Sequence, residues 1–156
     1  MRTWSTKSAA VAITLDKTLL KVVTRIRDEV ADISLLEGHR GQKKQNEYFY
    51  GQPQRSKLPW PKGKHNKYPS LAVDLQPYPR PERTGVLRET LAYIAGAATA
   101  IGREEGVTIR WGGDWDRDSQ LGDQNFDDFF HLEVVLNETD HNDGSSNTAG
   151  DTGKGE

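Results

Sequence analysis

The stretch Lys64-His65-Asn66-Lys67-Tyr68-Pro69-Ser70-Leu71-Ala72-Val73-Asp74 places an imidazole in a proline-containing loop and a carboxylate at the end of a short apolar run. The run of residues 71–73 is too short for a helix and predicts a buried strand. Burying a lone carboxylate is very costly, so Asp74 must be paired, hydrogen-bonded or bound to a metal. The stretch therefore predicts a core strand that also carries a functional acid.

A second stretch, Asp128-Phe129-Phe130-His131-Leu132-Glu133-Val134-Val135-Leu136, predicts another strand over residues 130–136, with a histidine near its start. His65, Asp74 and His131 supply the three protein ligands that a catalytic zinc site uses, with the fourth position left to water. The spacing of the first two ligands is not a specific pattern. From spacing alone, the alternative stays open that these are a loop histidine, a strand-end cap and a half-buried core residue.

Metal-assisted hydrolysis also needs a carboxylate that takes a proton from the attacking water. Asp128 can do so only if the chain turns before the strand begins, because in a straight strand it would face away from His131. Asp127 and Asp123 are rivals for this role, and a solvated acidic loop is the alternative for all three. Glu133 shares a strand face with His131, so it either orients the imidazole or is exposed.

Five further side chains are candidates for binding substrate. Arg40 follows a predicted strand and can hold a carboxylate or stabilise an oxyanion, although a surface ion pair is the alternative. Arg55, Ser56 and Lys57 lie in a basic loop that either binds an anionic group or is merely solvated. Trp115 either lines a groove or packs in the core.

Apolar periodicity and turn residues predict the remaining elements. We expect helices over residues 16–33, 41–50 and 85–105, and strands over residues 33–36, 70–75, 107–111 and 130–136. This order predicts an α+β domain with a small, mostly antiparallel sheet and flanking helices, spanning residues 1–136. Residues 137–156 are polar without an aromatic residue, which predicts a disordered tail.

Composition narrows the class of protein. The chain has 156 residues, a net charge of −2 and no cysteine, so any metal must be held by histidine and carboxylate. The charge gives no reason to expect a nucleic acid partner. No segment is long enough to span a bilayer, and the apolar run at residues 9–13 is brief for a secretion signal. We expect a monomer made in the cytoplasm, without membrane insertion.

Taken together, these motifs resemble a known family. They are Glu37-Gly38-His39-Arg40 with Gln45, Tyr48 and Arg55-Ser56-Lys57; His65 with Ser70-Leu71-Ala72-Val73-Asp74; Trp111-Gly112-Gly113-Asp114-Trp115; and Asp128-Phe129-Phe130-His131-Leu132-Glu133. Over residues 15–136 the chain resembles the zinc D-alanyl-D-alanine carboxypeptidases and L-alanyl-D-glutamate endopeptidases, which share a fold with the Hedgehog signalling domain. The phage endolysin branch is the most similar in size and character.

The resemblance implies one Zn²⁺ held by His65, Asp74 and His131, with Asp128 as the base and Arg40 stabilising the polarised carbonyl or a substrate carboxylate. Eight residues separate the first histidine from the aspartate, where many members have six. Many members also have glutamate as the base, which leaves Asp127 a contender.

The implied function is cleavage of the L-Ala–D-Glu bond in peptidoglycan stem peptides by a phage endolysin. Such an enzyme accumulates in the host cytoplasm and reaches the wall when a holin opens the membrane. The first alternative is a D-alanyl-D-alanine carboxypeptidase. Two remote alternatives are a non-catalytic zinc-binding module and a non-haem iron oxygenase, whose metal is also held by two histidines and one carboxylate.

Overall fold

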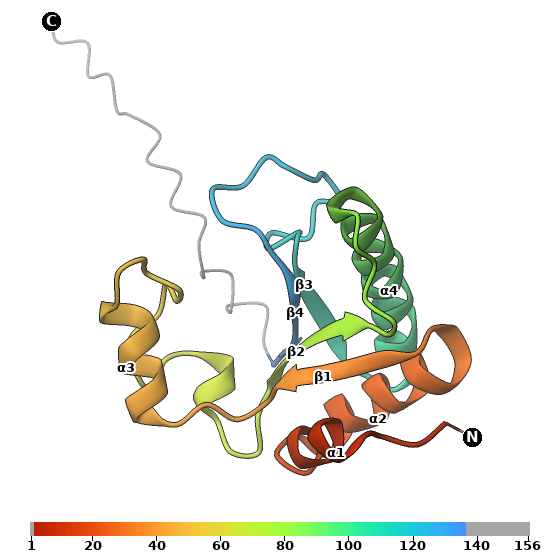
Figure 1. Cartoon of the computed structure of the whole chain (residues 1–156), viewed down its shortest axis with the longest axis horizontal. Coiled ribbons are helices and arrows are strands. Elements are labelled where there is room, and N and C mark those ends of the chain that lie inside the picture. The colour runs from red at the N-terminus through yellow and green to blue at the C-terminus, as the bar shows by residue number, and fades with distance from the viewer. Residues whose placement is uncertain (1, 137–156) are drawn as a thin grey trace, which may run out of the picture.

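The two strands expected to carry the metal ligands are neighbours at the centre of one sheet (Figure 1). The computed structural model describes residues 2–136, so the predicted disordered tail lies outside the described residues. Strands β1 (Ile33–Glu37), β2 (Ala72–Pro77), β4 (Asp128–Val135) and β3 (Thr108–Gly112) form the sheet in that order. Each neighbouring pair is antiparallel, which confirms the predicted α+β class.

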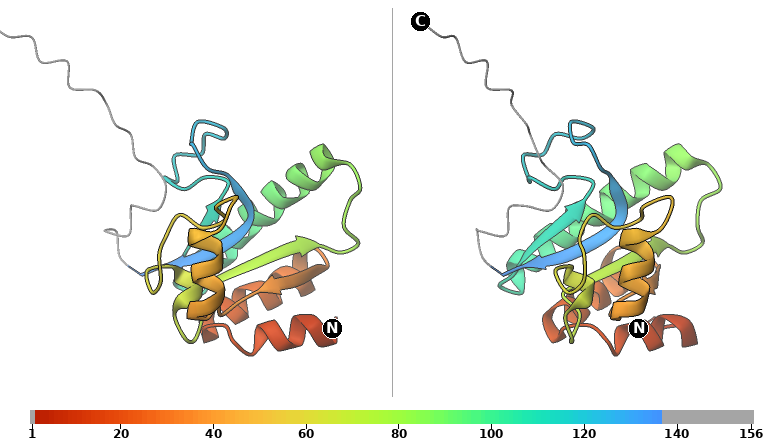
Figure 2. Two further views of the ribbon diagram at one scale, coloured as in Figure 1. Left: turned by 60° about the vertical axis from the view of Figure 1, so that its left-hand side comes forward. Right: turned by 90° about the vertical axis from the view of Figure 1, so that its left-hand side faces the viewer.

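Two helices cover one face of this sheet and form the core with it (Figures 1 and 2). Helix α2 (Lys17–Arg25) begins at Asp16, whose side chain accepts hydrogen bonds from two backbone N–H groups of the first turn. Helix α4 (Thr84–Glu104) buries an inner face that includes Leu87, Leu91, Ile94, Ala98 and Ile101. Burial of these apolar faces is the main favourable contribution to folding.

The N-terminal third differs from the prediction in two places. The helix expected over residues 16–33 ends as an α-helix at Arg25 and continues as a π-helical turn, Ile26–Val30, before β1 starts. A short helix, α1 (Thr6–Ala12), was not predicted, because its apolar run covers less than two turns. Ser5 caps it by accepting a hydrogen bond from the Ser8 backbone N–H.

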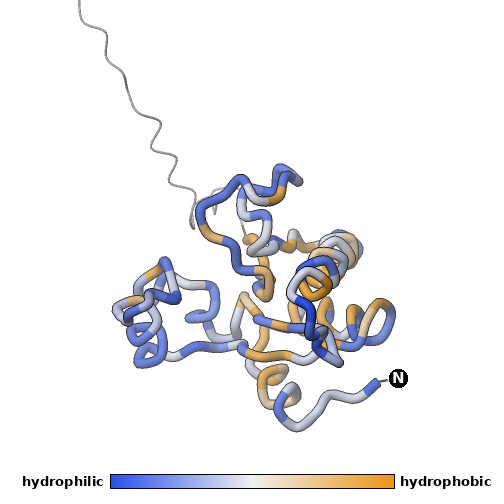
Figure 3. The backbone as a smooth tube through the Cα atoms, turned by 45° about the horizontal axis from the view of Figure 1, so that its top comes forward, coloured by the Kyte–Doolittle hydropathy of each residue, from blue (hydrophilic) through white to orange (hydrophobic). Residues whose placement is uncertain are grey.

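Helix α3 (Gln42–Tyr50) and the loop after it stand to one side of the sheet, away from α2 and α4 (Figure 1). Both are mostly hydrophilic (Figure 3). Gln45 is the one buried residue of the helix, and its side-chain amide donates to Ser56 Oγ and to the Leu58 carbonyl. These bonds attach the loop to the helix. Among the described residues, no helix is long and apolar enough to cross a membrane.

A bulge in β4 decides how its first residues point. Trp111 pairs with Leu132, but the next residue, Gly112, pairs with Asp128, so β4 carries three extra residues at this position. A bulge bends its strand and redirects the side chains beside it. A side chain on Gly112 would collide with the Asp128 carbonyl oxygen, so glycine permits this close approach. The change of direction that Asp128 needs to face the same side as His131 is therefore made by this bulge within β4.

Candidate active site

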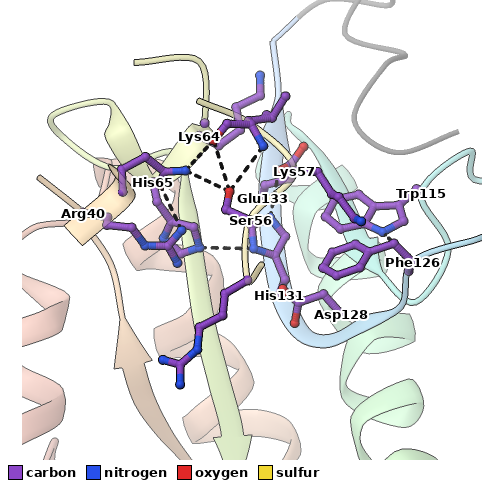
Figure 4. A pocket seen from close by; sticks show the side chains of 14 residues that line it. Arg40, Ser56, Lys57, Lys64, His65, Trp115, Phe126, Asp128, His131 and Glu133 are labelled. Atoms are coloured by element: carbon purple, nitrogen blue, oxygen red, sulfur yellow. Dashed lines mark hydrogen bonds and ion pairs between the residues drawn. The ribbon is translucent and has the colours of Figure 1, made fainter. Parts of the chain in front are cut away.

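Three side chains from three elements converge, those of His65, Asp74 and His131, and Figure 4 shows the two histidines. His65 belongs to a short 3-10 helix, η2 (Lys64–Asn66), whereas Asp74 and His131 are direct partners in the β2–β4 ladder. His65 Nε2 lies 3.2 Å from Asp74 Oδ1 and 3.2 Å from His131 Nδ1. His131 Nδ1 is also 3.2 Å from Asp74 Oδ1. The predicted ligand set is thus brought together around one point.

Hydrogen bonds on the far side of each ring fix which nitrogen faces that point. His65 Nδ1 lies 2.6 Å from the Gly38 carbonyl oxygen, to which it must donate, so its Nε2 carries a lone pair. His131 Nε2 lies 2.8 Å from Glu133 Oε2, so in the neutral ring Nδ1 carries the lone pair. With both imidazoles neutral, their two lone pairs and one carboxylate oxygen point at each other, an arrangement that a shared cation, either a metal ion or a proton, stabilises.

The geometry of this set fits a zinc ion. Zinc bonds to nitrogen and oxygen are about 2.0–2.2 Å long, so two ligands of a tetrahedral site are about 3.3–3.5 Å apart. The three separations of 3.2 Å are close to that edge length. Together His65, Asp74 and His131 form a candidate metal site.

The site is strongly polarised without a cation. Burial disfavours the charged form of His131, but hydrogen bonds to Asp74 and Glu133 outweigh burial and raise the pKa of His131 to about 10. Burial likewise opposes ionisation of Asp74, yet the charge and hydrogen bonds of the two histidines hold the pKa of Asp74 far below its usual range. A proton thus stabilises the site where a metal would otherwise bind, and metal binding must displace it.

Asp128 lines the same cleft as His65 and His131 (Figure 4). Burial, and after it the negative charge of Asp74, raises the pKa of Asp128. The rival Asp127 is exposed, accepts a hydrogen bond from the Gln124 amide and is absent from the cleft lining. Geometry therefore favours Asp128 as the carboxylate that can exchange a proton with a reacting group.

Arg40 lies at the opposite wall of the cleft and is held by several partners (Figure 4). Its Nε and Nη2 donate to the two carboxylate oxygens of Glu37, at 3.0 and 3.1 Å, and its Nη1 donates to Gln45. Nη2 is also 3.8 Å from Asp74 Oδ2. Its guanidinium stacks over the Tyr48 ring. Arg40 is thus a fixed, buried cation and not the surface ion pair that was the alternative.

The four other predicted substrate contacts all line this cleft, in different settings. Arg55 and Lys57 are exposed, and the Lys57 amine lies over the Phe126 ring. Ser56 Oγ bonds to Gln45 and to the Leu58 carbonyl, so its hydroxyl mainly stabilises the loop. Trp115 is half-buried, with its ring centroid 5.2 Å from that of His131. It therefore packs against His131, a predicted metal ligand, and borders the cleft at the same time.

Sequence reasoning missed two partners of the site. Arg110 of β3 is buried and donates from Nε to Glu133 Oε1 at 2.9 Å, which forms a chain Arg110–Glu133–His131. Asn66 donates to the Arg40 carbonyl and to Gln45. The only hint for Arg110 is a cation in the middle of an otherwise apolar strand, where a buried charge requires a partner.

The sequence of residues 2–135 matches the family described as phage L-alanyl-D-glutamate peptidase. The chain belongs to this family. The peptidase has the fold of the Serratia marcescens L-Ala D-Glu endopeptidase ChiX, with a TM-score of 0.60, 21% identity, and coverage of 85% of this chain and 89% of that one. A comparison with curated protein sequences found no match.

Membership confirms the resemblance that the motifs indicated, and it makes the chain a peptidoglycan-cleaving peptidase of the endolysin type. It also argues against the iron oxygenase alternative, since the family is one of peptidases. The identity of the metal and the roles of the individual residues remain predictions.

Proposed function

We propose that the protein is a zinc-dependent phage endolysin that hydrolyses the L-Ala–D-Glu bond of peptidoglycan stem peptides. One observation carries this proposal: His65 Nε2, His131 Nδ1 and Asp74 Oδ1 converge at 3.2 Å, beside a second carboxylate, that of Asp128. A purely structural cluster needs neither the convergent lone pairs nor Asp128. Membership of a peptidase family supports the same reaction.

His65 Nε2, Asp74 Oδ1 and His131 Nδ1 would hold the ion. When bound, zinc supplies a Lewis acid that polarises a carbonyl and lowers the pKa of water to about 7. Asp128 accepts a proton from the attacking water and later donates it to the leaving amine. Its burial and its proximity to Asp74, which raise the pKa of Asp128, help it to hold that proton between the two steps.

Arg40 binds the substrate through the guanidinium N–H groups that do not bind Glu37 or Gln45. An arginine has five N–H groups, and three of those of Arg40 bind Glu37 and Gln45. One N–H on each terminal nitrogen makes no hydrogen bond with the described residues, although Nη2 also lies 3.8 Å from Asp74 Oδ2, and these two N–H groups bind a substrate carbonyl or carboxylate. Because Glu37 and Tyr48 fix the guanidinium in advance, little side-chain entropy is lost when it binds.

Arg55 and Lys57 bind a carboxylate next to the scissile bond. A D-glutamyl residue has two carboxyl groups and continues the peptide through one of them, so the other stays free and negatively charged. The two exposed cations at the cleft supply charge of the opposite sign. Trp115 borders the cleft and excludes water from one side of His131.

The protein accumulates in the host cytoplasm and reaches the wall after a holin opens the membrane, as expected for a phage lysis enzyme. Expression with and without a pore-forming holin tests this: lysis only with the pore supports the proposal, and lysis without it contradicts it.

Digestion of purified peptidoglycan tests the reaction itself. Mass spectrometry of the products should show stem peptides released without their L-alanine, with a new amino terminus on D-glutamate. Loss of a single terminal D-alanine would instead identify a D-alanyl-D-alanine carboxypeptidase. Metal analysis of the purified enzyme should find one zinc per chain, and chelation should abolish hydrolysis until zinc is restored. If the zinc-loaded chain hydrolysed nothing, the alternative of a non-catalytic zinc-binding module would be favoured.

A further inference from the structure

The charges of this chain are unevenly distributed. Residues 41–67, which we call the basic arm, contain seven lysine or arginine residues and one acid, Glu47, although the whole chain has a net charge of −2. The basic arm consists of α3, the following loop and η2, and it stands beside the sheet on the side away from α2 and α4 (Figures 1 and 2). The rest of the chain is therefore acidic, and the positive charge is gathered on one projecting segment.

Most of these cations have no acidic partner within residues 2–136. Lys44 pairs with Glu37 at 2.8 Å, but five exposed cations make no ion pair with the residues that the structure describes. They are Lys43, Arg55, Lys57, Lys62 and Lys67. Elsewhere cations such as Arg25 are engaged by several carboxylates. Like charges concentrated on one segment repel one another and lower its stability, unless an anionic partner neutralises them.

The basic arm is continuous with the catalytic cleft. Arg55 and Lys57 belong to the arm and also line the cleft. Lys43, Lys62 and Lys67 lie outside the cleft lining, so they do not contact the peptide at the scissile bond. A partner that reaches them must extend beyond one stem peptide.

We propose that the basic arm binds the carboxylates of neighbouring stem peptides in polymeric peptidoglycan while one stem peptide occupies the cleft. This inference rests on the proposed function, which supplies the polymer. Every uncut stem peptide with a D-glutamyl residue retains a free carboxylate, so the polymer presents a repeated row of negative charges. Several weak contacts to such a row add up through high local concentration, without any single tight contact. The arm thus holds the enzyme on the wall as a second binding surface on the catalytic domain.

Binding is tested with peptidoglycan sacculi freed of attached phosphate polymers. Hydrolysis is blocked by Asp128→Asn, and a triple variant of this protein, Lys43→Gln, Lys62→Gln and Lys67→Gln, is compared with a matched control. The control, Lys7→Gln, Lys17→Gln and Arg83→Gln, removes the same charge from exposed residues outside the arm. We expect cosedimentation to show about tenfold weaker binding for the arm variant and less than a twofold change for the control. Raising the salt concentration should shrink the difference, because the contacts are exposed.

Chemical amidation of the sacculus carboxylates should remove the difference between the arm variant and the chain with an intact arm. With Asp128 restored, the arm variant should cleave intact sacculi more slowly but hydrolyse a short soluble peptide with an L-Ala–D-Glu bond at an unchanged rate. Equal losses in the arm and control variants would overturn the proposal, as would binding that survives amidation. Binding that requires the phosphate polymers would also overturn it.

Failure of the proposed function would look different. In that case the unmodified chain would leave the soluble peptide intact, whereas carboxylate-dependent binding through the arm would still be measured.

Discussion

Replacing Glu133 by leucine should lower both the stability of the fold and the affinity for metal, for two different reasons. Glu133 accepts a hydrogen bond from His131 Nε2 at 2.8 Å and one from Arg110 Nε at 2.9 Å, and all three side chains are buried. The substitution leaves the Arg110 charge in the core without its carboxylate. Removing one partner of a buried ion pair costs about 3–5 kcal/mol. The free energy of unfolding of the metal-free protein should fall by that amount in a urea titration.

The same substitution should weaken metal binding for a separate reason. Without Glu133, nothing on the described chain fixes the His131 proton on Nε2, so the Nδ1 lone pair is no longer held toward Asp74. Loss of such an orienting partner lowers metal affinity by about 10–100-fold. Competition with a chromogenic chelator measures this value directly.

The double variant Arg110→Met with Glu133→Leu distinguishes the two effects. Replacing a buried ion pair by apolar residues of similar size is often neutral, so most of the lost stability should return. The metal affinity should stay low, because His131 still lacks its acceptor. Glu47→Leu, at an exposed position on α3, is the matched control and should change stability by about 0.5 kcal/mol or less. If the Glu133→Leu variant kept both its stability and its metal affinity, the positioning role of this chain of residues would be refuted.

Three other perturbations have defined outcomes. Asp128→Asn should lower kcat by about 10²–10⁴-fold with the metal retained, as measured by steady-state kinetics on a soluble peptide. Asp127→Asn should keep a kcat close to that of the unmodified enzyme. Similar losses in both variants would contradict the assignment of Asp128 as the base. Gly112→Ala should reduce activity and stability together, because its side chain would displace the Asp128 carbonyl, and a crystal structure with β4 unmoved would contradict this. Hydrogen bonds and ion pairs with Lys21, and then with Arg25, lower the pKa of Glu105 below its ordinary value of 4.5. This carboxylate therefore stabilises the fold above pH 4.5, and the contribution disappears as the pH falls through the lowered pKa. Thermal unfolding should show Glu105→Gln less stable at pH 7 and equal at low pH, and a constant difference would exclude linkage to this group.

Most of the elements could be predicted because their signals are local. The inner face of α4 repeats every three to four residues, and each of the sheet strands appears in the sequence as a short apolar run near a turn. Helix α1 was missed because seven residues give too little periodicity. The π-helical turn was missed because its side chains follow the same apolar pattern as the α-helix that precedes it.

The candidate site was predictable only in part. The types and order of the ligand residues carried the hypothesis for His65, Asp74 and His131, since two imidazoles and an acid on predicted strands suit one metal. The orientation of Asp128 was left conditional on a turn, because a bulge depends on pairing with a partner strand that lies elsewhere in the chain. Arg110 was not a candidate, because nothing near it in the sequence reveals an acid 23 residues away.

The sequence by itself thus determined the strands that carry the ligands, the residue types that can bind a cation and the basic character of residues 41–67. These properties depend on side-chain chemistry and on short-range periodicity. Only the tertiary structure decided which nitrogen of each histidine faces the metal position, since the Gly38 carbonyl that fixes His65 is 27 residues distant. It also decided that Asp128, and not its exposed neighbour, turns into the cleft. Both outcomes require backbone groups from separate strands and loops to meet, and that contact exists only once the sheet has formed.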